Sequence, residues 1–259
     1  MAAWRDLVIR LPIIGRWCER DDETFAVDDI VLEAPSPIVS RSVRKSLREN
    51  NYENAEAYLV RHLVRPGDSV LDLGSGLGLT SIAAAKASRG GRVVGYEANP
   101  AIAPLAERNV RRNGVQVEIR NRAIAEKKGV CPFHVRRSFP ASSLFATRGS
   151  KTISIQADAA QEVIDEIQPA VIACDIEGLE REVLVTANLA RVQRLVVEVH
   201  PQIIGASGVE ECVRALAASG LHRVEPLCYG QVLVFDRDGS CSSIEPFPSR
   251  RPAGRKASA

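Results

Sequence analysis

Residues 70–78 read VLDLGSGLG, and this stretch decides the fold. Val70, Leu71 and Leu73 form a short apolar run of the kind found in the middle of a parallel sheet. Residues 80–86 are rich in alanine and favour a helix. Between the two the backbone has to turn sharply, and glycine adopts positive φ and lets a ligand lie against the main chain. The stretch therefore predicts a strand, a cofactor-binding glycine loop and a helix.

The spacing of the glycines indicates which cofactor binds. Asp72 is followed by Gly-x-Gly-x-Gly, whereas the dinucleotide motif is Gly-x-Gly-x-x-Gly and binds a pyrophosphate. Residues 92–97 predict a second strand, which ends at Glu97. A carboxylate in that position can accept two hydrogen bonds from a ribose diol. We therefore expect an adenosine cofactor without a pyrophosphate, namely S-adenosylmethionine.

The composition is that of a soluble globular protein. The chain has 259 residues, 45% of them hydrophobic and 25% charged, which is enough for one α/β domain. A net charge of +2 gives no argument for a nucleic-acid partner. The six cysteines have no paired spacing, so we expect reduced thiols and a cytoplasmic protein. No apolar run is long enough to cross a bilayer, and no signal peptide opens the chain.

Alternating strand and helix patterns predict a doubly wound, mostly parallel α/β sheet, and two closing strands without a helix between them predict an antiparallel edge hairpin. We expect an N-terminal helical segment over residues 1–64, the main domain over 65–245 and a disordered basic tail over 246–259. Within the first segment, residues 4–17 mix tryptophan, aliphatic residues and arginine. They are expected to dock on the domain or a partner, with membrane-surface contact as the less favoured alternative.

Ligands bind at the carboxyl ends of the strands in an open parallel sheet. The residues at the predicted strand ends are mostly polar or glycine. They are Asp72 with the loop glycines, Glu97, Asn121, Asp175 with Glu177, and Glu198 with His200. Five such ends on one edge of the sheet predict the active site there.

Five segments taken in order resemble the FkbM-type S-adenosylmethionine-dependent methyltransferases. They are VLDLGSGLGLTSI (70–82), GYEANP (95–100), NRAIAEKKGVCPFHV (121–135), CDIEGLEREVL (174–184) and LVVEVHP (195–201). The segment from Asp175 to Glu180 is the most specific of them, since many methyltransferase families share the glycine loop. Two positions depart from the family pattern: Ala173 replaces a common lysine, and residues 157–160 blur a Leu-Asp-Asp segment.

The resemblance implies the class I methyltransferase fold, which is Rossmann-like, and O-methylation of a hydroxyl on a sugar, a polyketide or a related small metabolite. It implies that Asp175 faces the methyl-transfer region and that Tyr52 helps to close the cofactor site. The full cofactor-binding set expected here is Tyr52, Asp72, Gly74, Ser75, Gly76, Glu97, Ala98, Asn121, Ala123 and Asp175.

A hydroxyl acceptor needs a base to remove its proton, and His200, Asp175 and Glu198 are the candidate catalytic residues. His200 is the favoured base, Asp175 is the alternative, and a purely structural histidine remains open. Carboxylate and imidazole groups also suit a divalent cation, but we assign no metal ligand.

Two other functions use the same sheet. A NAD(P)-dependent oxidoreductase would need the longer glycine spacing, which is absent. A non-catalytic S-adenosylmethionine-binding module would not need titratable groups at Asp175 and His200. We therefore expect a methyltransferase whose partner is a small-molecule hydroxyl acceptor, with no nucleic acid and no peripheral membrane contact. The sequence leaves the identity of the acceptor and the oligomeric state undetermined.

Overall fold

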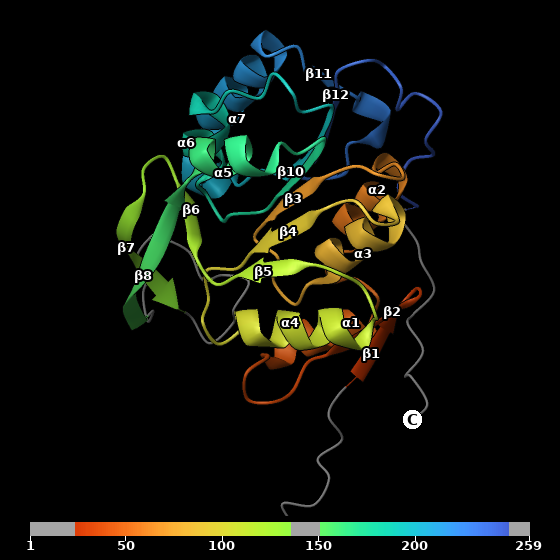
Figure 1. Ribbon diagram of the computed structural model, residues 1–259, viewed down its shortest axis with the longest axis vertical. Helices are drawn as coiled ribbons and strands as arrows, with labels where there is room; N and C mark the ends of the chain where they lie inside the picture. The colour runs from red at the N-terminus through yellow and green to blue at the C-terminus, as the bar shows by residue number, and fades with distance from the viewer. Residues whose placement is uncertain (1–23, 136–150, 249–259) are drawn as a thin grey trace, which may run out of the picture.

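The computed structural model describes residues 24–135 and 151–248, and a seven-stranded sheet forms their centre (Figure 1). In spatial order its strands are β11 (His222–Arg223), β12 (Val232–Asp236), β10 (Arg194–Glu198), β9 (Val171–Cys174), β3 (Val70–Leu73), β4 (Val93–Tyr96) and β5 (Glu118–Arg120). The strands from β10 to β5 are parallel, and β12 pairs antiparallel with β10 and β11. The predicted fold, a doubly wound α/β sheet with an antiparallel edge, is confirmed.

Helices cover both faces of this sheet because successive side chains of a strand point to opposite faces. Val70 of β3 packs with α2 (Asn54–Leu63) and α3 (Leu79–Ser88). Leu71 and Leu73 face the opposite side. The helices on that side are α5 (Ala160–Ile167), α6 (Glu180–Thr186) and α7 (Pro201–Ala218). Since β3 is buried on both faces, its apolar run is continuous rather than alternating.

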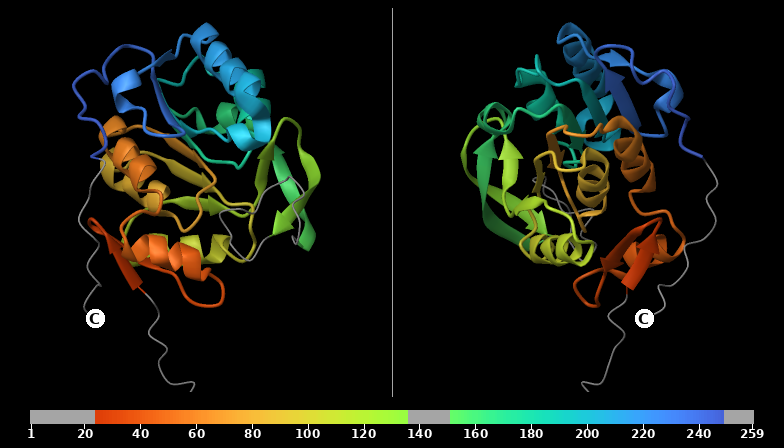
Figure 2. Two further views of the ribbon diagram at one scale, coloured as in Figure 1. Left: turned by 180° about the vertical axis from the view of Figure 1, so that it is seen from behind. Right: turned by 45° about the vertical axis from the view of Figure 1, so that its right-hand side comes forward.

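The N-terminal segment is not wholly helical, which corrects the prediction for residues 1–64. It does contain α1 (Arg41–Arg48) and α2, but β1 (Thr24–Val27) and β2 (Ile30–Glu33) form an antiparallel hairpin before them (Figure 2). The hairpin lies on α4 (Ala103–Arg112). The Asn113 side chain accepts a hydrogen bond from Val31 N and donates one to Val31 O. Val31 and Asn113 are 82 residues apart in the sequence, so the local sequence pattern did not indicate this contact.

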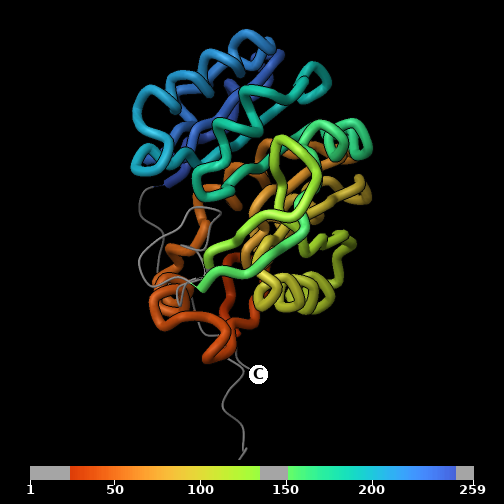
Figure 3. The backbone as a smooth tube through the Cα atoms, turned by 90° about the vertical axis from the view of Figure 1, so that its left-hand side faces the viewer, coloured from red at the N-terminus to blue at the C-terminus, as the bar shows by residue number. Residues whose placement is uncertain are grey.

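A second, three-stranded sheet stands beside the central one (Figure 3). Its middle strand β8 (Lys151–Ala159) pairs antiparallel with β7 (Gly129–Val135) and parallel with β6 (Ala123–Ala125). The local sequence pattern did not predict β6, which is only three residues long. Because β8 runs directly into α5, this sheet is an insertion between β5 and the next crossover helix.

Several sequence predictions fall outside the described residues, namely the docking segment 4–17, Cys18 and most of the basic tail. The other five cysteines are free thiols, and all are buried or partly buried. Among residues 24–135 and 151–248, no helix is long and apolar enough to cross a membrane.

A buried ion pair ties β10 to the turn that precedes β3. The Arg194 side chain is 4% exposed, and its Nη2 lies 3.0 Å from Asp68 Oδ2. Its Nη1 donates a hydrogen bond to the carbonyl oxygen of Leu63 at the end of α2. One guanidinium therefore holds a helix, a turn and a strand together, on the edge of the sheet opposite the candidate site.

We predict that Asp68→Ala lowers the free energy of unfolding by about 3–5 kcal/mol, because it leaves the Arg194 charge buried and unpaired. Urea denaturation measures the change. The double variant Asp68→Ala/Arg194→Met should recover part of the loss, since it buries no charge. A single variant as stable as the wild type would contradict the role of this ion pair.

Candidate active site

The glycine loop packs directly against two segments from elsewhere in the chain. The amides of Gly74 and Ser75 donate to the carbonyl oxygen of Tyr96, at 2.9 and 2.8 Å, and turn the loop across β4. Gly74 has φ +92°, and a Cβ there would lie 1.8 Å from the carbonyl oxygen of Asp175. Gly76 has φ +50°, and a Cβ there would lie 2.7 Å from the Tyr52 hydroxyl. Glycine is therefore required at both positions by protein contacts as well as by backbone conformation.

Two buried carboxylates hold this loop. The Glu97 Oε2 accepts a hydrogen bond from Gly76 N at 2.9 Å, and its Oε1 accepts one from Asn99 N at 2.7 Å. The Asp72 carboxylate accepts a hydrogen bond from the Ser81 hydroxyl. Burial raises the pKa of Glu97 to about 7 and that of Asp72 to about 6. Each oxygen of Glu97 keeps a second lone pair, so the carboxylate can still accept hydrogen bonds from a ribose diol.

The remaining residues of the predicted cofactor set lie around the same loop. The Tyr52 hydroxyl accepts a hydrogen bond from Leu77 N at 3.4 Å. Asn121 donates from Nδ2 to the carbonyl oxygen of Glu97 at 2.8 Å and is exposed. Ser75 is fully buried, while Ala98 is partly exposed beside Glu97. Ala123 is buried in β6. The arrangement fits an adenosine cofactor, and the role of each residue remains a prediction.

The predicted catalytic residues meet at the ends of β9 and β10, which are neighbouring parallel strands. His200 is 5% exposed, and its Nε2 lies 3.7 Å from Asp175 Oδ1 and 3.5 Å from Glu177 Oε2. Its Nδ1 lies 2.8 Å from Glu180 Oε1. Asp175, Glu198 and His200 offer ligand atoms that all lie within 4.8 Å of one another. The structure therefore brings together every catalytic candidate that the sequence named.

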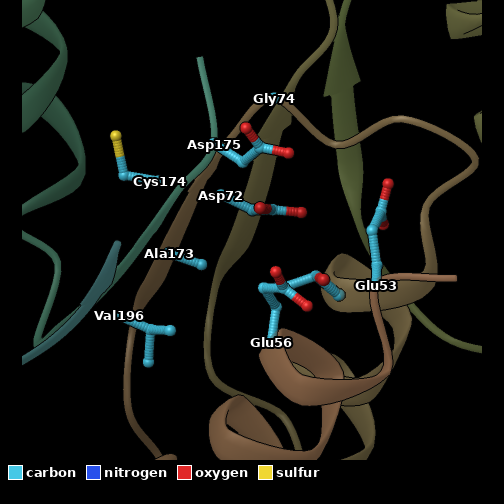
Figure 4. A pocket seen from close by; sticks show the side chains of 9 residues that line it. Glu53, Glu56, Asp72, Gly74, Ala173, Cys174, Asp175 and Val196 are labelled. Carbon is cyan, nitrogen blue, oxygen red and sulfur yellow. The ribbon is translucent and has the colours of Figure 1, made fainter. Parts of the chain in front are cut away.

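The three catalytic candidates line a cleft of about 630 Å³. Its lining includes Tyr52, Glu53, Glu56, Asp175, Glu177, Glu198 and His200. A narrower pocket extends from Glu53 and Glu56 to Gly74 of the cofactor loop. In Figure 4 the carboxyl groups of Glu53, Glu56, Asp72 and Asp175 are directed toward the same space. The cleft therefore joins the cofactor loop to the catalytic candidates and carries a high density of negative charge.

Burial changes the proton affinity of this cluster. It raises the pKa of both Glu56 and Glu177 to about 7, and the negative charge of Glu198 adds to the effect. Burial alone lowers the pKa of His200, but the hydrogen bond to Glu180 and the neighbouring carboxylates outweigh it and raise this pKa. Carboxyls with a pKa near 7 can take up a proton at neutral pH. Glu177, which lies 3.5 Å from His200, and Glu56 can therefore exchange protons near neutral pH.

Two site residues were not predicted from the sequence. Glu180 is fully buried and accepts hydrogen bonds from His200 and from Gly178 N. It ends the Asp-Ile-Glu-Gly-Leu-Glu segment, and a fully buried glutamate at a helix start cannot be recognised from sequence. Glu56 lies in the first turn of α2, where an acidic residue is ordinary, so its place in the cleft is visible only in three dimensions.

Comparisons with known proteins agree on the class of enzyme. A family model described as the methyltransferase small domain matches residues 48–134. Over 58 residues the chain is 53% identical to the ribosomal protein L11 methyltransferase of Thermus thermophilus, covering 22% of each chain. Over 59 residues it is 46% identical to that of Chloroflexus aurantiacus, covering 23% of this chain and 18% of that one. The chain spans about a fifth of the length of the curated relatives it matches.

Among solved structures, precorrin-6y C5,15-methyltransferase from Geobacter metallireducens is 13% identical and has a TM-score of 0.44. The match covers 79% of this chain and 91% of that chain. The fold assignment rests on the strand order described above rather than on this likeness.

The comparisons correct one prediction. We expected a small-molecule hydroxyl acceptor, but the matched curated relatives are named for a protein substrate, ribosomal protein L11. The segment that matches the methyltransferase small domain contains the glycine loop, which is the predicted binding site for S-adenosylmethionine.

We predict that Glu97→Ala weakens binding of S-adenosylmethionine by about 1.5–3 kcal/mol, the range for hydrogen bonds to a charged group. Isothermal titration calorimetry measures the affinity. Glu107→Ala is the matched control, because Glu107 is an exposed glutamate of α4. Equal affinity of the Glu97 variant and the wild type would show that this carboxylate does not contact the cofactor.

The raised carboxyl pKa values also predict how stability depends on pH. Between about pH 4.5, the ordinary Glu value, and about pH 7, the folded protein holds more protons than the unfolded chain. The free energy of unfolding of the cofactor-free protein should therefore fall as pH rises through this window. Glu97→Gln should flatten the profile by up to roughly 3 kcal/mol, whereas the exposed Glu162→Gln should not. Urea denaturation at a series of pH values tests this, and a stability that rises with pH would contradict it.

Proposed function

We propose that this protein is an S-adenosylmethionine-dependent O-methyltransferase whose acceptor hydroxyl is carried by another protein. The protein nature of the acceptor is supported by the curated relatives, which are named for a ribosomal protein substrate. The oxygen acceptor is supported by the set of proton-accepting groups at the ends of β9 and β10. The match covers only a short part of each relative, so their substrate is a candidate and not an assignment. Ribosomal protein L11 is the first substrate to test.

The observation that carries the proposal is the contact of Gly74 with Asp175. The Cβ that Gly74 lacks would overlap the Asp175 carbonyl oxygen, so the cofactor loop and the strand end that bears Asp175 are in direct contact. A methyl group presented by a cofactor on this loop would therefore lie beside the cleft that His200 and Glu198 line. Methyl transfer is an in-line displacement that depends mainly on such alignment.

When bound, S-adenosylmethionine supplies an electrophilic methyl group, whose bond to sulfur breaks as the bond to the acceptor oxygen forms. The chain's own residues must orient the acceptor and take its proton. His200 and Asp175 flank the cleft beside the cofactor loop, and either can accept the proton directly. Glu177 lies 3.5 Å from His200 and, with a pKa of about 7, can take the proton onward.

A protein amine is a second candidate acceptor, and the acidic lining of the cleft favours it. Five carboxylates face this space, namely Glu53, Glu56, Asp175, Glu177 and Glu198. They would attract the positive charge of a lysine side chain or an N-terminal amine. The ammonium would then have to lose its proton to a carboxyl such as Glu56 before it could attack the methyl group.

Two finer assignments accompany the proposal. The FkbM-type family rests on the segment from Asp175 to Glu180 and its resemblance, and it remains a prediction. The cytoplasmic location rests on the free thiols and remains a prediction as well.

The acceptor is tested by incubating the full chain with methyl-labelled S-adenosylmethionine and a ribosomal protein fraction. Label should appear in protein, and fragmentation mass spectrometry should place the methyl group on a hydroxyl side chain. A methyl group on lysine or an N-terminal amine would replace the first candidate by the second. Label in no protein fraction would overturn the protein-acceptor proposal.

We predict that His200→Asn lowers turnover by about 10²–10⁴-fold with little change in cofactor affinity, the usual contribution of one positioned proton acceptor. Single-turnover kinetics and calorimetry give the two quantities. His222→Asn is the control, because His222 is exposed on β11, away from the cleft. Turnover of the His200 variant at the wild-type rate would remove His200 from the mechanism and leave Asp175 as the base.

A further inference from the structure

We propose that Asp175, Glu198 and His200 form a binding site for a divalent metal ion. Their ligand atoms lie within 4.8 Å of one another. Ligands at about 2.0–2.2 Å from an ion lie at most about 4.4 Å apart, so a shift of a few tenths of an ångström would place all three on one ion. Asp175 directly follows β9, Glu198 ends β10, and His200 lies two residues farther on, so two neighbouring parallel strands position the site.

The histidine is already oriented as a metal ligand. Glu180 is fully buried, and its Oε1 lies 2.8 Å from His200 Nδ1. A carboxylate can only accept a hydrogen bond, so Nδ1 carries the proton and the lone pair of the neutral ring is on Nε2. Metal-bound histidines nearly always donate their other ring N–H to a carboxylate or a carbonyl in this way. Glu180 is therefore the positioning residue of the proposed site.

An independent observation points to a missing ligand. His200 is buried, with 5% of its surface exposed. Its Nε2 lies 3.5 Å from Glu177 Oε2 and 3.7 Å from Asp175 Oδ1, and both distances are too long for strong hydrogen bonds. The Asp175 Oδ1 is buried and has no hydrogen-bond partner among the described residues. Buried polar atoms are nearly always paired, so a group that binds Asp175 Oδ1 is expected. A cation satisfies Asp175 Oδ1 and His200 Nε2 at once.

The donor set indicates the kind of ion. Two carboxylate oxygens and one imidazole nitrogen suit Mn²⁺, Fe²⁺ or Zn²⁺ better than the all-oxygen sites that Mg²⁺ and Ca²⁺ prefer. Three protein ligands leave coordination positions open, and these face the cleft that His200 and Glu198 line. If the proposed function holds, an acceptor oxygen can occupy one of these positions, where the ion would favour loss of its proton. With His200 and Asp175 bound to the ion, a carboxylate of the cleft such as Glu177 or Glu56 would take that proton in their place. The ion would repel an ammonium group, so its presence also favours a hydroxyl over an amine acceptor.

The test measures metal binding to the full chain without cofactor or acceptor, so it is independent of the proposed function. Electron paramagnetic resonance of Mn²⁺ and calorimetry should show one saturable site on the wild type. His200→Ala and Glu198→Gln should each abolish it. Glu180→Gln should weaken the affinity by about 10–100-fold, the usual effect of losing an outer partner of a ligand. The exposed residues His222 and Glu162 provide the controls His222→Ala and Glu162→Gln, which should bind Mn²⁺ normally.

Circular dichroism of each variant distinguishes loss of the site from loss of the fold, and the wild-type titration does not depend on any variant. Competition with Zn²⁺ and Mg²⁺ then ranks the ions, and Zn²⁺ should displace Mn²⁺ more effectively than Mg²⁺ does. Absence of saturable Mn²⁺ and Zn²⁺ binding up to about 1 mM, the weak end of protein sites for divalent cations, would overturn the proposal. So would Mn²⁺ binding that the His200 and Glu198 variants retain.

Discussion

The close approach of Gly74 to the main chain of Asp175 is the constraint on which the site depends. No side chain fits between these two backbones, so the loop that follows β3 and the segment that follows β9 lie in contact. Because β10 is the next strand, its terminal Glu198 and His200 are brought to the same edge. One missing Cβ thus sets the distance between the cofactor loop and the groups that can act on an acceptor.

Several buried carboxyl groups gather at that edge, and burial favours their protonated form. Burial is the main cause that raises the pKa of Glu56, Glu177 and Glu97 to about 7. Burying these groups costs free energy of folding, whereas the continuous apolar interior of the sheet stabilises the fold. Such local cost is typical of functional sites, where ionisable groups are held for a ligand rather than for stability. A cofactor sulfonium, a metal ion or a cationic acceptor would each reduce this repulsion.

Glu180 and Glu97 are buried glutamates that perform related tasks in two parts of the site. Glu97 holds the loop through Gly76 and Asn99 amides and keeps lone pairs for a ribose. Glu180 holds His200 and so leaves its Nε2 directed into the carboxylate cluster. In both cases a buried carboxylate accepts hydrogen bonds from a neighbouring group and fixes its position.

The local patterns of the sequence predicted the sheet, the glycine loop and the polar strand ends, because apolar runs, glycine spacing and polar residues can be recognised in neighbouring positions. Tertiary structure decided the hairpin of β1 and β2, the strand β6 and the roles of Glu56 and Glu180. Each depends on contacts between distant segments, such as Asn113 with Val31 or Glu180 with His200. A glutamate in a first helical turn has the same local pattern whether it faces solvent or a catalytic histidine. The prediction of a small-molecule acceptor came from a family resemblance rather than from these local patterns, and the curated relatives contradict it.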